Sequence, residues 1–193
     1  LGLGLVFVGG AYWFRDKVAI ASARVMPADL AQYPDYHVGQ LDESFLAIQG
    51  PPGTGKTWTG ARIIHGLVTS GHRVGITAFS HAAIDNLLRE VVKVFAEAGG
   101  DDDLSAIRRV SEVPVDGLEG VEYTKNNNKC MDSAHNLVAG TTWLFARPDM
   151  RANPVDFLVI DEAGQLGLAD ALAAASGSKN VVLLGDPQQL SQV

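Results

Sequence analysis

The stretch GPPGTGKT, from Gly50 to Thr57, decides the fold class of this chain of 193 residues. It fits the pattern GxxxxGK[ST], in which glycines let backbone N–H groups turn inward around phosphate oxygens. Lys56 is expected to reach the β- and γ-phosphates of ATP, and Thr57 to be a ligand of Mg²⁺. The alternative is a glycine-rich turn that binds nothing. The residues predicted to contact the nucleotide are Gly50, Pro51, Pro52, Gly53, Thr54, Gly55, Lys56 and Thr57.

Short apolar runs and segments with helical periodicity alternate along the chain from residue 45 onward. Segments 45–49, 73–77, 107–110, 136–140, 155–160 and 180–184 are predicted strands, and segments 56–70 and 82–98 are predicted helices. This alternation predicts an α/β fold with a parallel sheet and helices on both faces. In such sheets ligands bind at the carboxyl ends of the strands. The stretch 114–129 is polar and rich in Gly and Asn, so it predicts a surface insertion near 99–135.

The composition is that of a globular protein, and the formal net charge is -7. An acidic balance argues mildly against a dedicated nucleic-acid binder, but it allows a narrow basic groove or a basic partner domain. The single cysteine, Cys130, excludes a disulfide framework and favours a reducing, cytoplasmic location. Residues 1–14 are apolar but too short to span a bilayer, so no membrane partner is predicted.

The first residue is Leu1, so we expect a fragment of a longer protein. Residues 1–40 are predicted to be the remnant of an upstream region, and residues 41–193 to form the nucleotide-binding domain.

An acidic pair, Asp161 and Glu162, ends the predicted strand 155–160 about a hundred residues after the loop. In this Walker B arrangement Asp161 holds the Mg²⁺ shell, and Glu162 orients or deprotonates the attacking water. Such a pair alone is commonly a helix cap. Together with the phosphate loop, it predicts hydrolysis of a nucleoside triphosphate.

Two later stretches, IDEAGQL at 160–166 and LLGDPQQL at 183–190, narrow the prediction. With the loop, they resemble motifs I, II and III of superfamily 1 helicases. The form DEAxQ is similar to the 1B branch, which contains RNA-surveillance helicases and nuclease-fused Dna-two-type helicases. The fullest likeness is to bacterial proteins that join a RecB-like nuclease to such a helicase.

The resemblance implies a RecA-like P-loop NTPase domain that is truncated after motif III. It places Gln165 and Asp186 beside the nucleotide. It also implies that Gln189 contacts the γ-phosphate and couples it to the nucleic-acid track. The alternative for Gln189 is an exposed polar residue in a turn.

A third stretch, TAFSHAAIDNLL at 77–88, resembles motif Ia of the same branch. The resemblance implies that Ser80 and His81 touch a nucleic-acid backbone, because phosphates favour helix N-termini. The alternatives are that Ser80 is only an N-cap and that His81 is merely solvated.

The stretch AGTTWLFAR, at 139–147, lies where the branch carries its motif Ib/Ic threonine. Thr141 and Thr142 are therefore candidates for phosphate contacts. Trp143 and Phe145 either stack on bases or belong to the core, and the core is favoured because they flank an apolar strand.

The partners implied by the resemblance are single-stranded nucleic acid, with DNA favoured over RNA, a second RecA-like domain that this chain lacks, and a fused nuclease domain. The second domain supplies arginines to the ATP site, so we expect this chain to bind ATP–Mg²⁺ but to hydrolyse it poorly. Upstream of the loop, Gln32 and Gln40 are candidates for an adenine-recognition glutamine, but their surroundings, with Pro34 and Gly39, do not resemble the helix of the family at this place. The competing hypotheses are a remodelling ATPase of the AAA+ type and a non-motor nucleotide-binding module.

Overall fold

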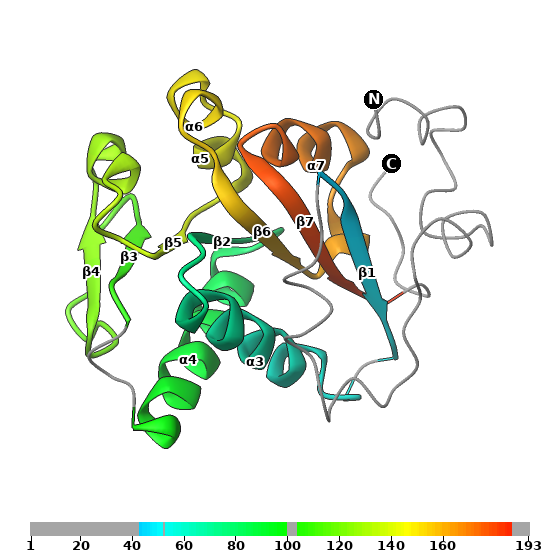
Figure 1. The fold of residues 1–193 in the computed structure, drawn as a ribbon, viewed down its shortest axis with the longest axis horizontal. Helices are drawn as coiled ribbons and strands as arrows, with labels where there is room; N and C mark the ends of the chain where they lie inside the picture. The colour runs from blue at the N-terminus through cyan, green and yellow to red at the C-terminus, as the bar shows by residue number, and fades with distance from the viewer. Residues whose placement is uncertain (1–42, 52, 100–103, 187–193) are drawn as a thin grey trace.

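The computed structural model describes residues 43–51, 53–99 and 104–186 (Figure 1). Its strands are β1 (Phe45–Gln49), β2 (Val74–Ala78), β3 (Ala106–Arg109), β4 (Val121–Thr124), β5 (Leu137–Ala139), β6 (Val155–Asp161) and β7 (Ser178–Gly185). Its helices are α3 (Lys56–Thr69), α4 (His81–Ala98), α5 (Thr142–Phe145), α6 (Pro148–Ala152) and α7 (Leu168–Ala175), with 3-10 turns η4 (Asn127–Met131) and η5 (Ala163–Gln165).

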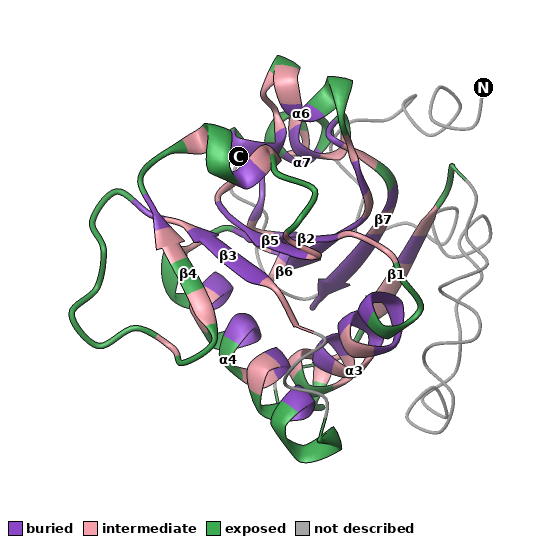
Figure 2. Cartoon of the chain, turned by 60° about the vertical axis from the view of Figure 1, so that its left-hand side comes forward, coloured by how far each residue is buried: buried purple, intermediate pink, exposed green. Residues whose placement is uncertain are grey.

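The strands form one sheet in the order β1-β7-β6-β2-β5-β3-β4, and every described pairing is parallel. Figure 2 shows the central strands buried between two helical layers. Helices α3 and α4 cover one face, and α5, α6 and α7 cover the other. The predicted α/β fold with a parallel sheet and helices on both faces is therefore confirmed.

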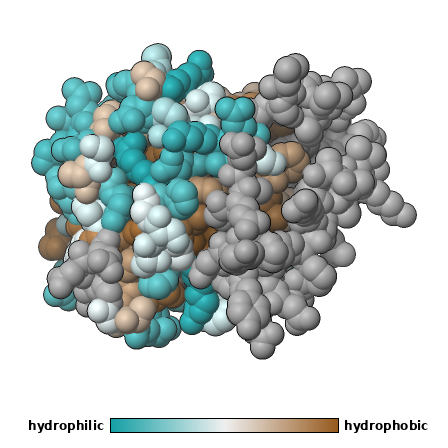
Figure 3. Space-filling view, in the orientation of Figure 1, coloured by the Kyte–Doolittle hydropathy of each residue, from teal (hydrophilic) through white to brown (hydrophobic). Residues whose placement is uncertain are grey.

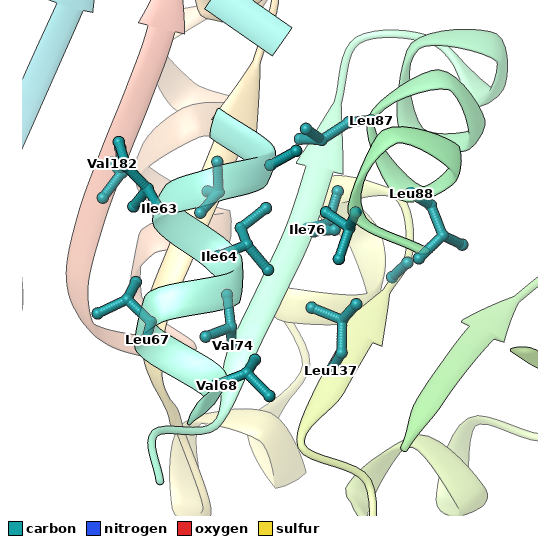
Figure 4. Packing of buried hydrophobic residues seen from close by; sticks show 14 of the residues in the cluster. Ile63, Ile64, Leu67, Val68, Val74, Ile76, Leu87, Leu88, Leu137 and Val182 are labelled. Carbon is teal, nitrogen blue, oxygen red and sulfur yellow. The ribbon is translucent and has the colours of Figure 1, made fainter. Parts of the chain in front are cut away.

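The core on the α3 and α4 face explains why these two helices form. Helix α4 turns an apolar stripe inward, including Leu87 and Leu88, as its helical periodicity predicts. These side chains meet Ile64 of α3 and Ile76 of β2 in a single cluster (Figure 4). Because α3 carries the end of the glycine loop, this packing fixes the loop against the sheet.

The parallel register brings the ends of distant strands to one edge of the sheet. Gln49 at the end of β1 pairs with Gly185 at the end of β7, and Ala78 at the end of β2 pairs with Asp161 at the end of β6. β5 joins the same edge, since the N–H of Gly140, which follows β5, donates to Ile76 O at 3.0 Å. This carboxyl edge is where ligands bind in parallel sheets.

Each of the predicted strands and helices is present, with ends that differ by two residues at most. The segment predicted as a surface insertion contributes β4, which pairs with β3 at the margin of the sheet. β4 lacks a continuous apolar run because an edge strand has one neighbour and is less buried than the central strands, and only Thr124 of its four residues is buried. Hydrophilic residues accordingly cover much of the surface on the side of β3 and β4 (Figure 3).

The N-terminal segment 1–40, Pro52 and Gln189 lie outside the described residues. Among the helices that the structure describes, none is long and apolar enough to cross a membrane.

Candidate functional site

The glycine loop connects β1 to the first turn of α3. Gly53 and Gly55 both have a φ of +80°, a conformation that L side chains rarely adopt. A Cβ at either position would meet nothing within 4 Å, so the backbone conformation, and not the available space, requires glycine there. At Gly50 the reason differs, because a Cβ would lie 2.7 Å from the Thr54 hydroxyl oxygen.

The side chain of Lys56 folds back into this loop. Its ammonium donates to the carbonyl oxygens of Gly50, at 2.6 Å, and of Pro51, at 2.9 Å. The Thr54 hydroxyl also donates to Pro51 O, at 2.8 Å. The loop is thus closed around a positive charge. Phosphate oxygens are charged acceptors and bind an ammonium more strongly than neutral carbonyls do, so this charge is available to a nucleotide.

Asp161 lies beside the loop at the end of β6 and is only 6% exposed. Its carboxylate accepts a hydrogen bond from the Thr57 side chain, and its Oδ1 accepts one from Glu162 N–H at 2.9 Å. Burial raises the pKa of Asp161, and the Glu162 charge adds to this, while the Glu162 N–H, the Lys56 ammonium and the Thr57 hydroxyl oppose it. A hydroxyl and a carboxylate in contact are oxygen ligands that suit Mg²⁺.

Glu162 adopts a left-handed backbone conformation, with φ +50° and ψ +36°. This conformation is strained for a residue with a Cβ, and such strain clusters at functional sites. The turn separates the environments of the two carboxylates, because Asp161 is buried and Glu162 is half-buried. The different roles predicted for the two acids are consistent with this difference in burial.

A cleft opens beside the loop and includes residues that the sequence pattern did not single out. It is lined by Gly53, Gly55, Lys56, Thr57, Trp58, Asn86, Arg89 and Glu90. Trp58 is exposed, and the Arg62 guanidinium lies 3.5 Å from the centroid of its ring. The signal for Trp58 was its position directly after Thr57. Asn86 and Arg89 belong to α4, so only the packing of α4 against α3 reveals them.

The other two residues predicted at the nucleotide lie on the same edge. Asp186 is buried and directly follows Gly185, whose carbonyl accepts the Gly50 N–H at 3.1 Å. Gln165 is half-buried at the end of η5, three residues after Glu162. Their direct contact with a nucleotide stays a prediction.

The predicted nucleic-acid contacts lie at the ends of the neighbouring strands β2 and β5. Ser80 is the N-cap of α4, and its hydroxyl accepts the Ala83 N–H at 3.1 Å. His81 is exposed at the first position of that helix. Thr141 caps α5 and Thr142 is its first residue, and both are half-buried. The parallel register thus brings two segments that lie about sixty residues apart in the sequence to one edge.

The two aromatic residues of this region have different environments. Phe145 is fully buried, as the core interpretation predicts, but Trp143 is 79% exposed, so that interpretation is wrong for Trp143. The reason is that both residues lie in the helix α5, where positions two apart are about 200° apart around the axis. Trp143 therefore remains a candidate for stacking on bases.

A family model described as an AAA domain matches residues 37–193. The chain belongs to this AAA domain family.

The relatives of this AAA domain include helicases with a nuclease. It is 29% identical over 154 residues to the DNA replication ATP-dependent helicase/nuclease DNA2 of Mus musculus, covering 78% of this chain and 14% of that protein. It is 30% identical over 154 residues to the protein of the same name from Gallus gallus, covering 78% of this chain and 15% of that protein. The chain thus spans about one seventh of the length of these relatives.

Among solved structures, the AAA domain is similar to an Arterivirus nonstructural protein 10 helicase in complex with DNA. The identity is 17% and the TM-score 0.49, over 78% of this chain and 30% of that chain. The family match and the relatives confirm the prediction of a RecA-like domain of a superfamily 1 helicase. The 1B branch and the likeness to bacterial nuclease fusions stay predictions.

Proposed function

We propose that this domain binds ATP–Mg²⁺ and that, in a longer protein, it couples ATP hydrolysis to movement along single-stranded nucleic acid. The observation that supports it most directly is that the Lys56 ammonium is held within the glycine loop, while the Thr57 side chain reaches Asp161 at the same edge of the sheet. These residues come from α3 and β6, and they combine a cation with two oxygen ligands. This combination suits a triphosphate and its metal ion.

Each protein group has a distinct role in this proposal. When the nucleotide binds, Lys56 gives up its hydrogen bonds with the Gly50 and Pro51 carbonyls and donates to phosphate oxygens instead. The new hydrogen bonds join two charged groups and are stronger, so they offset part of the free energy that is lost when the loop opens. Thr57 and Asp161 hold Mg²⁺, which neutralises charge on the β- and γ-phosphates when it is bound. Glu162 orients the attacking water and accepts its proton. Gln189, by the family resemblance, senses the γ-phosphate.

The proposed nucleic-acid path follows the ends of β2 and β5. Ser80, Thr141 and Thr142 offer hydroxyl groups along this edge, and the exposed ring of Trp143 offers a surface on which a base stacks. We favour DNA over RNA because the relatives named above are DNA replication proteins. We also propose a cytoplasmic location, which the single cysteine favours.

The first test is ATP binding to the chain itself, measured by isothermal titration calorimetry with Mg²⁺. Lys56→Ala is expected to weaken binding by about tenfold to a hundredfold, which corresponds to the loss of charge-assisted hydrogen bonds of about 1.5–3 kcal/mol. Hydrolysis by the chain alone is expected to stay slow, since the family resemblance assigns the catalytic arginines to a second RecA-like domain. Equal ATP affinity in both proteins contradicts the proposed binding mode.

The second test distinguishes a helicase motor from a remodelling ATPase or a non-motor module. It uses a longer protein that includes the next RecA-like domain, with ATPase activity measured with and without single-stranded DNA or RNA. Stimulation by single strands that Lys56→Ala abolishes supports the motor. Turnover that responds to neither nucleic acid excludes it and favours the remodelling ATPase.

A further inference from the structure

A fully buried arginine, Arg108, lies in strand β3 behind the first turn of helix α4. Its Nε donates to Asp85 Oδ1 at 2.7 Å, and one terminal nitrogen donates to Arg109 O at 2.8 Å. The other terminal nitrogen lies 3.1 Å from Nδ1 of His81. A buried guanidinium is destabilising unless it is paired, and Asp85 is the partner of Arg108. Arg108 also contacts His81, which is an exposed residue of the candidate nucleic-acid edge.

This contact determines the tautomer of His81. A guanidinium has only donors, so Nδ1 of His81 must be the acceptor, and the ring proton of the neutral imidazole must be on Nε2. The two ring nitrogens lie on different edges of the imidazole. With Nδ1 held by the buried arginine, the edge that carries Nε2–H is left as a hydrogen-bond donor on an exposed residue.

We propose that Arg108 is a positioning residue, which fixes His81 so that Nε2–H donates to a phosphate oxygen of single-stranded nucleic acid. The inference rests on the proposed function, because it needs a strand that passes the start of α4. The bonds also explain how the buried part of β3, with the sequence AIRR, accommodates an arginine. Asp85 balances the buried charge from α4, and its side chain remains 40% exposed.

The groove in front of this network is not itself an anion site. It is lined by His81, Asp85, Arg89, Arg108, Val110, Ser111, Glu112, Pro114, Asp116, Leu118 and Tyr123. Its three carboxylates, those of Asp85, Glu112 and Asp116, outnumber its two arginines, Arg89 and Arg108, and so oppose an anion that enters the groove. The proposed contact is therefore limited to a phosphate that meets His81 at the carboxyl edge of the sheet.

The test is a double-mutant cycle on the affinity of the chain for a fluorescent oligothymidylate, measured by anisotropy at fixed salt. His81→Ala is expected to weaken binding about tenfold, the loss of one hydrogen bond to a charged group. Arg108→Gln is expected to weaken it by a similar factor. The double variant is expected to bind no more weakly than His81→Ala, because Arg108 acts through His81.

Arg109→Gln is the matched control, since Arg109 also donates from Nε to a side chain and from a terminal nitrogen to the next carbonyl. Its side-chain partner is Asn127, away from α4, so oligothymidylate affinity is expected to stay unchanged. If the losses from His81→Ala and Arg108→Gln simply multiply, Arg108 has only a structural role and the proposal fails.

Two further measurements guard against misfolding of Arg108→Gln. Nitrogen-15 spectra of the His81 ring in the unaltered chain are expected to show unprotonated Nδ1 and protonated Nε2, and the opposite tautomer overturns the proposal. The glutamine of His81→Gln places its amide nitrogen near the position of Nε2, whereas the asparagine of His81→Asn places it near Nδ1. The His81→Gln chain is therefore expected to bind oligothymidylate more tightly than the His81→Asn chain. The reverse order also overturns it.

The outcomes separate this inference from the proposed function. If the unaltered chain binds no oligothymidylate and no oligouridylate, the proposed nucleic-acid path and this inference fail together. If it binds and the cycle shows independent effects, only the role of Arg108 and His81 fails.

Discussion

Gly60 lies in α3, one turn after the residues that are expected to hold ATP, and its replacement by alanine tests how the fold positions them. A Cβ at Gly60 would lie 2.4 Å from Leu184 Cδ1 of β7 and 3.6 Å from Leu87 Cδ1 of α4. Carbon atoms pack best at about 3.5–4.0 Å, so α3 or Leu184 must move by about 1 Å. Leu184 and Leu87 are fully buried, which leaves Leu184 little room to yield.

The expected change in the free energy of unfolding is the difference between two effects. Overpacking a core costs about 1–3 kcal/mol, whereas replacing glycine by alanine inside a helix gains about 0.5–1 kcal/mol. Gly60→Ala is therefore expected to destabilise the chain by about 1 kcal/mol, or about 2–4 °C in melting temperature for a domain of this size. Because α3 carries Lys56 and Thr57, ATP affinity is expected to fall as well.

The assay is urea denaturation of four proteins: the unaltered chain, Gly60→Ala, Leu184→Val and the double variant. Valine lacks the Cδ atoms that the new Cβ would meet. The loss of unfolding free energy in the double variant is therefore expected to be about 1 kcal/mol smaller than the sum of the losses in the two single variants. A Gly60→Ala chain that is about 1 kcal/mol more stable would refute the packing argument, since helix propensity alone would then decide the effect.

Three further predictions follow from single residues. An alanine at position 55 would have to adopt the left-handed conformation of Gly55, at a cost of about 1–2 kcal/mol. Gly55→Ala is therefore expected to distort the loop and to weaken ATP binding in calorimetry, and an unchanged affinity contradicts the backbone argument. Trp143→Ala is expected to leave the melting temperature unchanged, because the ring is 79% exposed, and to weaken oligothymidylate binding by about 5- to 100-fold in anisotropy; lowered stability with unchanged binding contradicts a stacking role. Burial raises the pKa of the Cys130 thiol to about 11, so the thiol is expected to react with iodoacetamide at pH 8 far more slowly in the folded chain than in urea. In the folded chain the rate is expected to rise only as the pH approaches 11. Equal rates at pH 8 in the folded and unfolded chains contradict this prediction.

The local pattern was sufficient for the elements that build the core. Helix α4 has a regular apolar stripe over 18 residues, and β6 contains the apolar run 157–160, so the local pattern identified both. Helix α5 has four residues, too few for any period to be visible. Helix α7 has eight residues, mostly alanine and leucine, so the contrast between its faces depends on a single polar residue, Asp170. β4 is polar because it lies at the sheet edge, and its pairing with β3 is not encoded in its own pattern.

The candidate site divides in the same way. The glycine loop is a contiguous motif whose residues lie within one turn of backbone, so the pattern alone predicted the loop, the helix that follows it and the place of Lys56 between them. The three-dimensional arrangement was needed to see that Thr57 reaches Asp161, that Trp143 is exposed while Phe145 is buried, and that Arg108 contacts His81. The physical reason is that local conformation depends on neighbouring residues, whereas burial and pairing depend on which distant strands the parallel register places side by side.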